Sequence, residues 1–211
     1  GMTTVQEDER FVLELQPLQN FTLETIHSTT PPFCCHLLLP DKPYLLVGTD
    51  SGQVLLYKRP FDKMGDFFPT KELGAHLGRV TCMIHDPQSG LVFTGSTDRM
   101  VKVWDPTPKE VRTHLVQTMA GHQHTVTSLS FHGNVLISCG MDGCINVWSS
   151  MHRPMLVYPF FLLDITIKRP SKVSVNSLGS SPNPTLGESA DISAGDGSGN
   201  VWVFHASTRD G

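Results

Sequence analysis

The amino-acid sequence predicts an all-β fold built from a repeated unit of small antiparallel sheets. Two stretches, 94–104 and 138–148, align with each other without a gap, and each ends in a tryptophan. These residues, Trp104 and Trp148, lie 44 positions apart, a period typical of stacked repeat architectures. Between the turn residues, the segments are short and rich in β-branched and apolar side chains. This composition favours strands over helices.

Two weaker copies of the repeat flank this central pair. They share glycine, serine and an amide side chain in register, and an aromatic residue closes every copy, at Tyr57, Trp104, Trp148 and Phe204. The intervals between these closing residues are 47, 44 and 56 positions. The long last interval contains the turn-rich segment 179–184, which we interpret as an inserted loop. The sequence therefore predicts four repeats.

The elements within the repeats follow from their residue types. We expect strands at 91–94, 101–104, 135–138 and 145–148. We expect tight turns at 97–100, 141–144 and 196–199. Because apolar residues run almost continuously along the strands and do not alternate strictly with polar ones, both faces of each sheet should be buried against neighbouring sheets.

Composition and charge exclude several classes of partner and location. The net charge of −4 arises from 16 basic and 20 acidic residues without a Lys/Arg cluster, so we predict no binding to nucleic acid. The longest apolar run, 155–163, is interrupted by Pro159 and is too short to span a membrane. The five cysteines form no CxxC pair, and the N-terminus lacks the features of a secretory signal. These features predict a soluble protein of the cytoplasm with reduced thiols.

The two central repeats resemble WD repeats, because each joins a loop histidine to a closing tryptophan at the family's spacing. The separation is 28 positions from His76 to Trp104 and 26 positions from His122 to Trp148. The family's dipeptides are also present, as Trp104-Asp105 and Gly121-His122. The resemblance covers most of residues 21–207. It implies a β-propeller with four antiparallel strands in each blade, the outer strand of one blade leading into the inner strand of the next.

The resemblance also implies a polar network inside each blade, from the loop histidine through a hydroxyl residue and an aspartate to the tryptophan indole. Carried over by position, the network residues are His76, Thr94, Asp98 and Trp104 in the first central repeat, and His122, Ser138, Asp142 and Trp148 in the second. The flanking repeats place Ser51 and Ser198 where the central ones have aspartate. We therefore expect the first and last blades to rest on apolar stacking, with His27 as a loose equivalent of the loop histidine.

The same pattern gives a domain organisation. We predict an N-terminal arm at 1–20, a spare outer strand at 21–28, blades at 29–73, 74–120, 121–171 and 172–207, and a tail at 208–211. Family rings hold roughly seven or eight blades, so four would form a partial ring or half of a larger, possibly eight-bladed, propeller. Two interpretations stay open: a fragment of a longer propeller protein, or two copies joined head to tail.

Motif analysis favours binding over catalysis. The sequence contains no GxSxG elbow, HExxH, P-loop or GxGxxG motif, so we predict no enzyme activity and no cofactor. His124 with Cys139 and Cys144 could suggest a metal site, but buried cysteines usually act as small apolar residues, and we predict no metal. We expect a scaffold that docks protein segments on a propeller face. The alternatives are a self-assembling subunit that completes a ring, as a homodimer or within a larger complex, and a propeller-based hydrolase.

The docking candidates are residues expected on the exposed loops of one face. They are Arg79, Arg99, His124 and Met141, since arginine and methionine are over-represented at interfaces. Each could alternatively be an ordinary solvated side chain. Trp202 could be a partly exposed anchor or could pack between blades.

Overall fold

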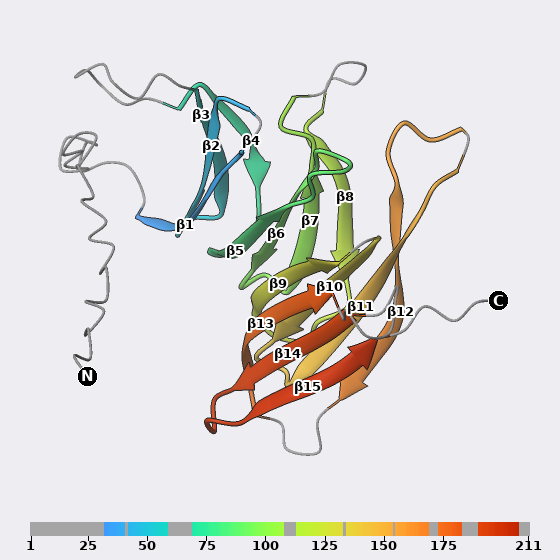
Figure 1. Ribbon diagram of the computed structural model, residues 1–211. Helices are drawn as coiled ribbons and strands as arrows, with labels where there is room; N and C mark the ends of the chain where they lie inside the picture. Colours follow the sequence, from blue (N-terminus) through green and yellow to red (C-terminus); the bar gives the residue numbers. More distant parts are fainter. Residues whose placement is uncertain are drawn as a thin grey trace, which may run out of the picture.

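The computed structural model describes residues 32–40, 42–58, 69–107, 113–132, 134–153, 155–168, 173–182 and 190–206. Within these ranges the chain is all-β, as predicted, and its strands form four antiparallel sheets (Figure 1). None of the described residues belongs to a helix long and apolar enough to cross a membrane. The predicted arm at 1–20, the predicted outer strand at 21–28, His27 and the predicted tail at 208–211 lie outside the described residues.

Each sheet corresponds to one repeat and is called a blade below. Blade one contains β1 (Phe33–Leu38), β2 (Tyr44–Thr49), β3 (Gln53–Lys58) and β4 (Lys71–Ala75). Blade two contains β5 (Val80–His85), β6 (Val92–Ser96), β7 (Met100–Trp104) and β8 (Leu115–Ala120). Blade three contains β9 (Val126–His132), β10 (Val135–Gly140), β11 (Cys144–Met151) and β12 (Phe160–Lys168). Blade four contains three described strands, β13 (Val175–Pro182), β14 (Ala190–Asp196) and β15 (Val201–Ala206).

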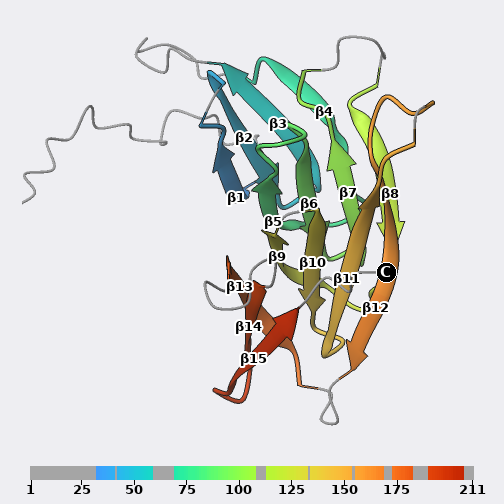
Figure 2. The ribbon, with the colours of Figure 1, turned by 45° about the vertical axis from the view of Figure 1, so that its right-hand side comes forward.

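The four blades follow one another side by side in chain order, and their first strands lie along one edge of the stack. β5 contacts both β1 and β9, and β9 contacts β13 (Figure 2). Each blade starts at this inner edge, and each later strand lies one step further outward. This arrangement is that of successive propeller blades, with no closed barrel among the described strands.

The hydrophobic core lies between the blades. Val54 and Leu56 of blade one pack with Val92 and Trp104 of blade two. Equivalent clusters join blade two to blade three and blade three to blade four. Each internal strand is therefore covered on both faces, which accounts for its nearly continuous apolar sequence. The prediction of two buried faces is confirmed for β6, whose five residues are all buried.

All four blades have the same tight turn between their second and third strands. In each turn, the N–H of the fourth residue donates to the carbonyl of the first, at 3.1–3.2 Å. The fourth residue has a positive φ, of 96° at Gly52, 74° at Arg99, 72° at Gly143 and 84° at Gly199. Arg99 is the one non-glycine residue with positive φ among the described residues.

Candidate functional site

Blade two brings together all four residues of its predicted network. The indole Nε1 of Trp104 donates to Thr94 Oγ1 at 2.7 Å, and the same hydroxyl lies 2.7 Å from His76 Nε2. The other ring nitrogen of the histidine, Nδ1, lies 2.9 Å from Asp98 Oδ2. The chain of contacts thus runs from the inter-blade core to the surface turn without a gap.

The chemistry of these groups fixes the direction of each hydrogen bond. An ionised carboxylate can only accept, so His76 must carry its proton on Nδ1 and donate to Asp98. The neutral ring then accepts at Nε2 from the Thr94 hydroxyl, which in turn accepts from the indole. Every member is satisfied, which a buried polar network needs in order to stabilise a fold.

Asp98 also fixes the backbone of the neighbouring loop. Its carboxylate accepts from the N–H of Leu77 at 2.9 Å, on the loop that precedes the first strand of the blade. It accepts as well from the N–H of Met100 at 2.9 Å, within its own turn. One carboxylate therefore holds two surface segments against each other.

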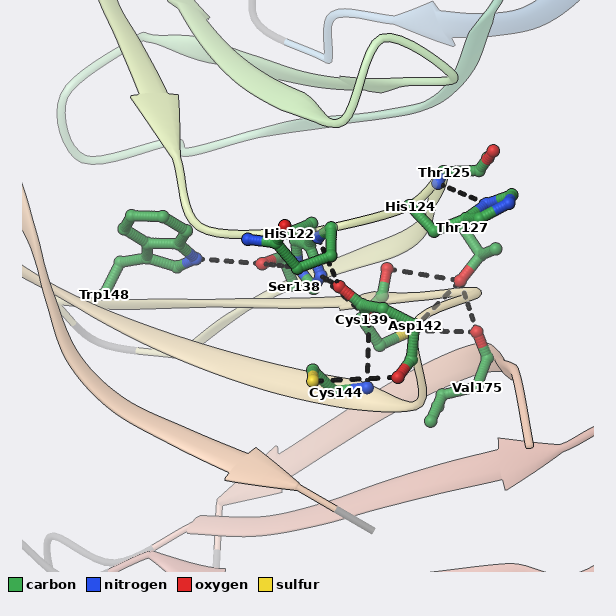
Figure 3. Close-up of polar contacts among 11 residues, drawn as sticks. His122, His124, Thr125, Thr127, Ser138, Cys139, Asp142, Cys144, Trp148 and Val175 are labelled. Carbon is green, nitrogen blue, oxygen red and sulfur yellow. Dashed lines mark hydrogen bonds and ion pairs between the residues drawn. The ribbon is translucent and has the colours of Figure 1, made fainter. Parts of the chain in front are cut away.

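Blade three repeats this arrangement (Figure 3). Trp148 Nε1 donates to Ser138 Oγ at 2.9 Å, which lies 2.8 Å from His122 Nε2, and His122 Nδ1 lies 3.0 Å from Asp142 Oδ2. Asp142 accepts from the N–H of Gln123 at 2.7 Å. The loop before the blade and the turn within it are thus fixed in the same way as in blade two.

The environment holds both histidines in the neutral form that these networks need. Burial lowers the pKa of His76 and His122 below their ordinary value and outweighs the opposing effect of Asp98 and Asp142. Burial alone would raise the pKa of Asp98, but the N–H groups of Met100 and Leu77 and the nearby His76 lower it. The carboxylates therefore stay ionised while the imidazoles stay uncharged.

These shifts predict a loss of stability in mild acid. Below pH 6.5, the ordinary pKa of histidine, the unfolded chain binds protons at His76 and His122, whereas the folded chain does not until the pH falls further. The free energy of unfolding should therefore be highest above pH 6.5 and should fall as the pH is lowered below it. Thermal melts across this range would measure the effect.

A double His76→Gln, His122→Gln variant provides the control for this pH dependence. Because glutamine does not titrate, the variant should lose less stability than the wild type between neutral pH and mild acid. Equal slopes of melting temperature against pH would show that these two histidines do not cause the loss.

Blade four differs from the expectation of apolar stacking alone. Asp196, which is 8% exposed, accepts from the indole Nε1 of Trp202 at 3.2 Å and from the N–H groups of Ser198 and Asn200. The carboxylate stands at the first position of the turn and not at the third, so alignment with Asp98 did not reveal it. Trp202 is 42% exposed, in agreement with its interpretation as a partly exposed residue.

The four docking candidates lie on the loops and turns that the networks fix. In blade two, Thr97 donates its N–H to the carbonyl of Arg79 at 3.0 Å, which joins the Arg79 loop to the Arg99 turn. In blade three, Met141 donates its N–H to the carbonyl of Thr125 at 2.9 Å, next to His124. We call these loops and turns, at the same end of both blades, the loop face.

All four candidate side chains are accessible. The side chain of Arg79 is 57% exposed, Met141 is 47% exposed, and Arg99 and His124 are also exposed. The Nε of Arg79 donates to Asp50 Oδ1 of blade one, a contact between blades that sequence spacing did not indicate. A groove of about 490 Å³ lies beside this pair and is lined by Pro32, Phe33, Cys34, Asp50, Arg79 and Thr81.

Leu77 is a feature of the loop face that was not among the docking candidates. Leu77 is 97% exposed although its backbone N–H is bonded to Asp98, so an apolar side chain stands in solvent on a fixed loop. Among the described residues, no group of three or more His, Cys, Asp or Glu side chains is placed to hold a metal ion. The loop face offers cationic and apolar contacts.

Comparison with known proteins agrees with this geometry. The family described as "WD domain, G-beta repeat" matches residues 67–105 and 113–149, which contain the two complete networks. These two stretches are WD repeats. The first contains β4 of blade one and β5 to β7 of blade two, and the second contains β8 of blade two with β9, β10 and most of β11 of blade three.

Curated WD-repeat relatives match the chain in part. The nuclear distribution protein PAC1-1 of Uncinocarpus reesii is 38% identical over 84 residues, which cover 38% of this chain and 18% of that protein. The WD repeat and FYVE domain-containing protein 1 of Mus musculus is 34% identical over 111 residues, which cover 52% of this chain and 26% of that protein. The chain thus spans about a quarter or less of the length of these relatives.

Solved structures share the fold. The computationally designed Ika4 protein matches with a TM-score of 0.56 and 18% identity, over 87% of this chain and 96% of Ika4. The computationally designed Ika8 protein matches with a TM-score of 0.57 and 20% identity, over 82% of this chain and 46% of Ika8. At these identities the likeness concerns the arrangement of blades.

Proposed function

We propose that this WD-repeat chain is a non-catalytic scaffold that docks segments of partner proteins on its loop face, around Arg79, Arg99, His124 and Met141. One observation carries the proposal. The side chains of the loop face are exposed, while hydrogen bonds to the buried networks hold the backbone of its loops in place. A surface whose loops are already ordered loses less conformational entropy on binding. The presence of WD repeats supports a role in protein–protein interaction.

The state of the histidines supports a non-catalytic role. Both ring nitrogens of His76 and of His122 are engaged inside the blades, and burial keeps the pKa of each ring low. Neither ring is therefore free to take a proton from a bound molecule. We also propose an intracellular, cytoplasmic location, in which the five free cysteines would stay reduced.

A charge-reversal experiment tests the docking face. Arg79→Glu together with Arg99→Glu should abolish capture of partners from a native cell extract, identified by mass spectrometry against the wild type. The matched control is Lys58→Glu with Arg153→Glu. It makes the same charge change at two exposed positions away from the loop face, the last residue of β3 and a residue beyond the end of β11. If both double variants capture the same partners as the wild type, the loop face is not the docking surface.

A second candidate function is self-assembly, favoured by the open side of blade four. Val201 and Val203 of β15 are 72% and 60% exposed. By register, Val201 corresponds to Val54 and Val101, which are 0% and 1% exposed because the next blade covers them. We propose that a second copy of the chain supplies the covering blade, so that two copies stack head to tail.

One residue on the opposite side of blade one is also exposed, although Val47, Leu55 and Tyr57 of that blade are buried in a cluster of their own. Leu38 is 47% exposed, whereas its equivalent in blade three, Phe131, packs against Phe93 of the preceding blade with ring centroids 5.4 Å apart. Light scattering should give twice the chain mass of 23.3 kDa at micromolar concentration, and Val203→Lys should restore the single-chain mass. A wild-type monomer at that concentration would remove this candidate.

A further inference from the structure

The turn of blade two has the same backbone as the other three turns, but its fourth residue is not glycine. Its fourth residue is Arg99, held at φ 74°, while Gly52, Gly143 and Gly199 fill the same position in the other blades. Residues with a Cβ are disfavoured in this left-handed region, and glycine adopts it freely. Arginine therefore makes this turn less stable than glycine would.

No described contact inside the blade compensates for this strain. The Arg99 backbone N–H bonds to Ser96, as in the other turns, but its guanidinium forms no hydrogen bond or ion pair with another described residue. The side chain is exposed. A strained residue that contributes nothing to its own fold suggests a function outside it.

Two further exposed groups are fixed beside Arg99. Asp98 binds the N–H of Leu77, and Thr97 binds the carbonyl of Arg79, so the preceding loop is tied on both sides of the turn. Leu77 is 97% exposed and the Arg79 side chain is 57% exposed. One apolar and two cationic side chains thus lie on two neighbouring segments that are hydrogen-bonded to each other.

Blade three shows that the network itself does not need these residues. By register, Gln123, Thr125 and Gly143 occupy the positions of Leu77, Arg79 and Arg99. Asp142 still binds the N–H of Gln123, and the same histidine network forms beneath it. The combination of leucine with two arginines is therefore particular to blade two.

We infer that Leu77, Arg79 and Arg99 form a docking point for an acidic peptide segment that carries an aliphatic residue beside its carboxylates. The inference rests on the proposed docking function and specifies its partner. A guanidinium binds a carboxylate through two parallel N–H donors, and Arg99 is free to do so. The Nε of Arg79 already donates to Asp50 of blade one, so Arg99 carries the guanidinium that has no partner among the described residues. Leu77 adds an exposed apolar side chain that the aliphatic residue of the peptide would cover.

The turn offers a variant that removes the charge without harming the fold. Arg99→Gly installs the residue that the other three turns already use, so its melting temperature should equal or exceed that of the wild type. Leu77→Gln likewise installs the residue of blade three. Arg153→Gly serves as the control, because it removes an exposed arginine beyond the end of β11, away from the loop face.

Selection from a random peptide library displayed on phage tests the inference. Peptides enriched on the wild type should be rich in Asp and Glu with an adjacent Leu, Ile or Val. They should bind Arg99→Gly and Leu77→Gln about tenfold more weakly, should bind Arg153→Gly unchanged, and should dissociate more readily in high salt.

Four outcomes would overturn the inference. Enriched peptides without acidic residues, or acidic peptides that bind Arg99→Gly as tightly as the wild type, would contradict the assigned chemistry. Peptides whose binding is lost on Met141→Ala in blade three but kept on Arg99→Gly would overturn it while leaving the loop face as a docking surface. Failure to enrich any acidic sequence would also contradict it, and partner capture with the charge-reversal pair would then decide the proposed function separately.

Discussion

Trp104→Ala is expected to lower the free energy of unfolding by about 3–5 kcal/mol. The indole is 1% exposed and lies in the cluster that joins blades one and two, so alanine would leave a cavity that neither blade can close. The change would also remove the donor to Thr94 at the inner end of the network. Urea denaturation followed by circular dichroism would measure the loss.

Trp202→Ala is the matched control, because it removes the same side chain from the equivalent repeat. Trp202 is 42% exposed on β15, so little cavity would form and the loss of stability should be much smaller. Equal losses for the two variants would contradict the assignment of the core to the spaces between blades.

Asp98→Ala should cost about 3 kcal/mol, although the residue lies at a surface turn. Without the carboxylate, the N–H groups of Leu77 and Met100 and the ring of His76 all lose an acceptor, and the ring is buried. Thermal and urea denaturation would measure the cost. Hydrogen exchange at Leu77 and Met100 would report whether the loop is released.

Asp50→Ala is the control for this second variant. Asp50 is also an aspartate in the second-to-third strand turn, but its side chain is 43% exposed and pairs with the exposed Arg79. Exposed ion pairs contribute little to stability, so this change should leave the melting temperature nearly unchanged. If both aspartate variants lose equal stability, the networks do not support the blades as described.

The sequence was sufficient to predict the repeated β-fold, for a physical reason. A blade that lies between two others is covered on both sides, so its internal strands are almost continuously apolar and end at turns that demand glycine or polar residues. The same pattern of strands and turns occurs in the two aligned stretches that end at Trp104 and Trp148. The network partners were predictable because His76 and His122 stand at matching distances from these tryptophans.

The loop face was predictable only in part. Arg79, Arg99, His124 and Met141 were proposed from loop position, but exposure and pairing depend on neighbouring blades. The contact between Asp50 and Arg79 joins residues 29 positions apart in different repeats, and no periodic signal marks it. The strain at Arg99 did leave a signal, since the aligned turns carry glycine at Gly52, Gly143 and Gly199. The role of Asp196 was not predicted, because Asp196 is the first residue of its turn whereas Asp98 and Asp142 are the third.

Three of the four apolar clusters among the described residues are each shared by two consecutive blades, so each blade builds much of its core jointly with a neighbour. The folding of one unit is then coupled to that of its neighbour, and cooperativity passes along the series like that of a one-dimensional chain of spins. Fluctuations that open the molecule should begin at the terminal units and propagate inward, with amide protons of β15 exchanging fastest and those of β6 and β10 slowest.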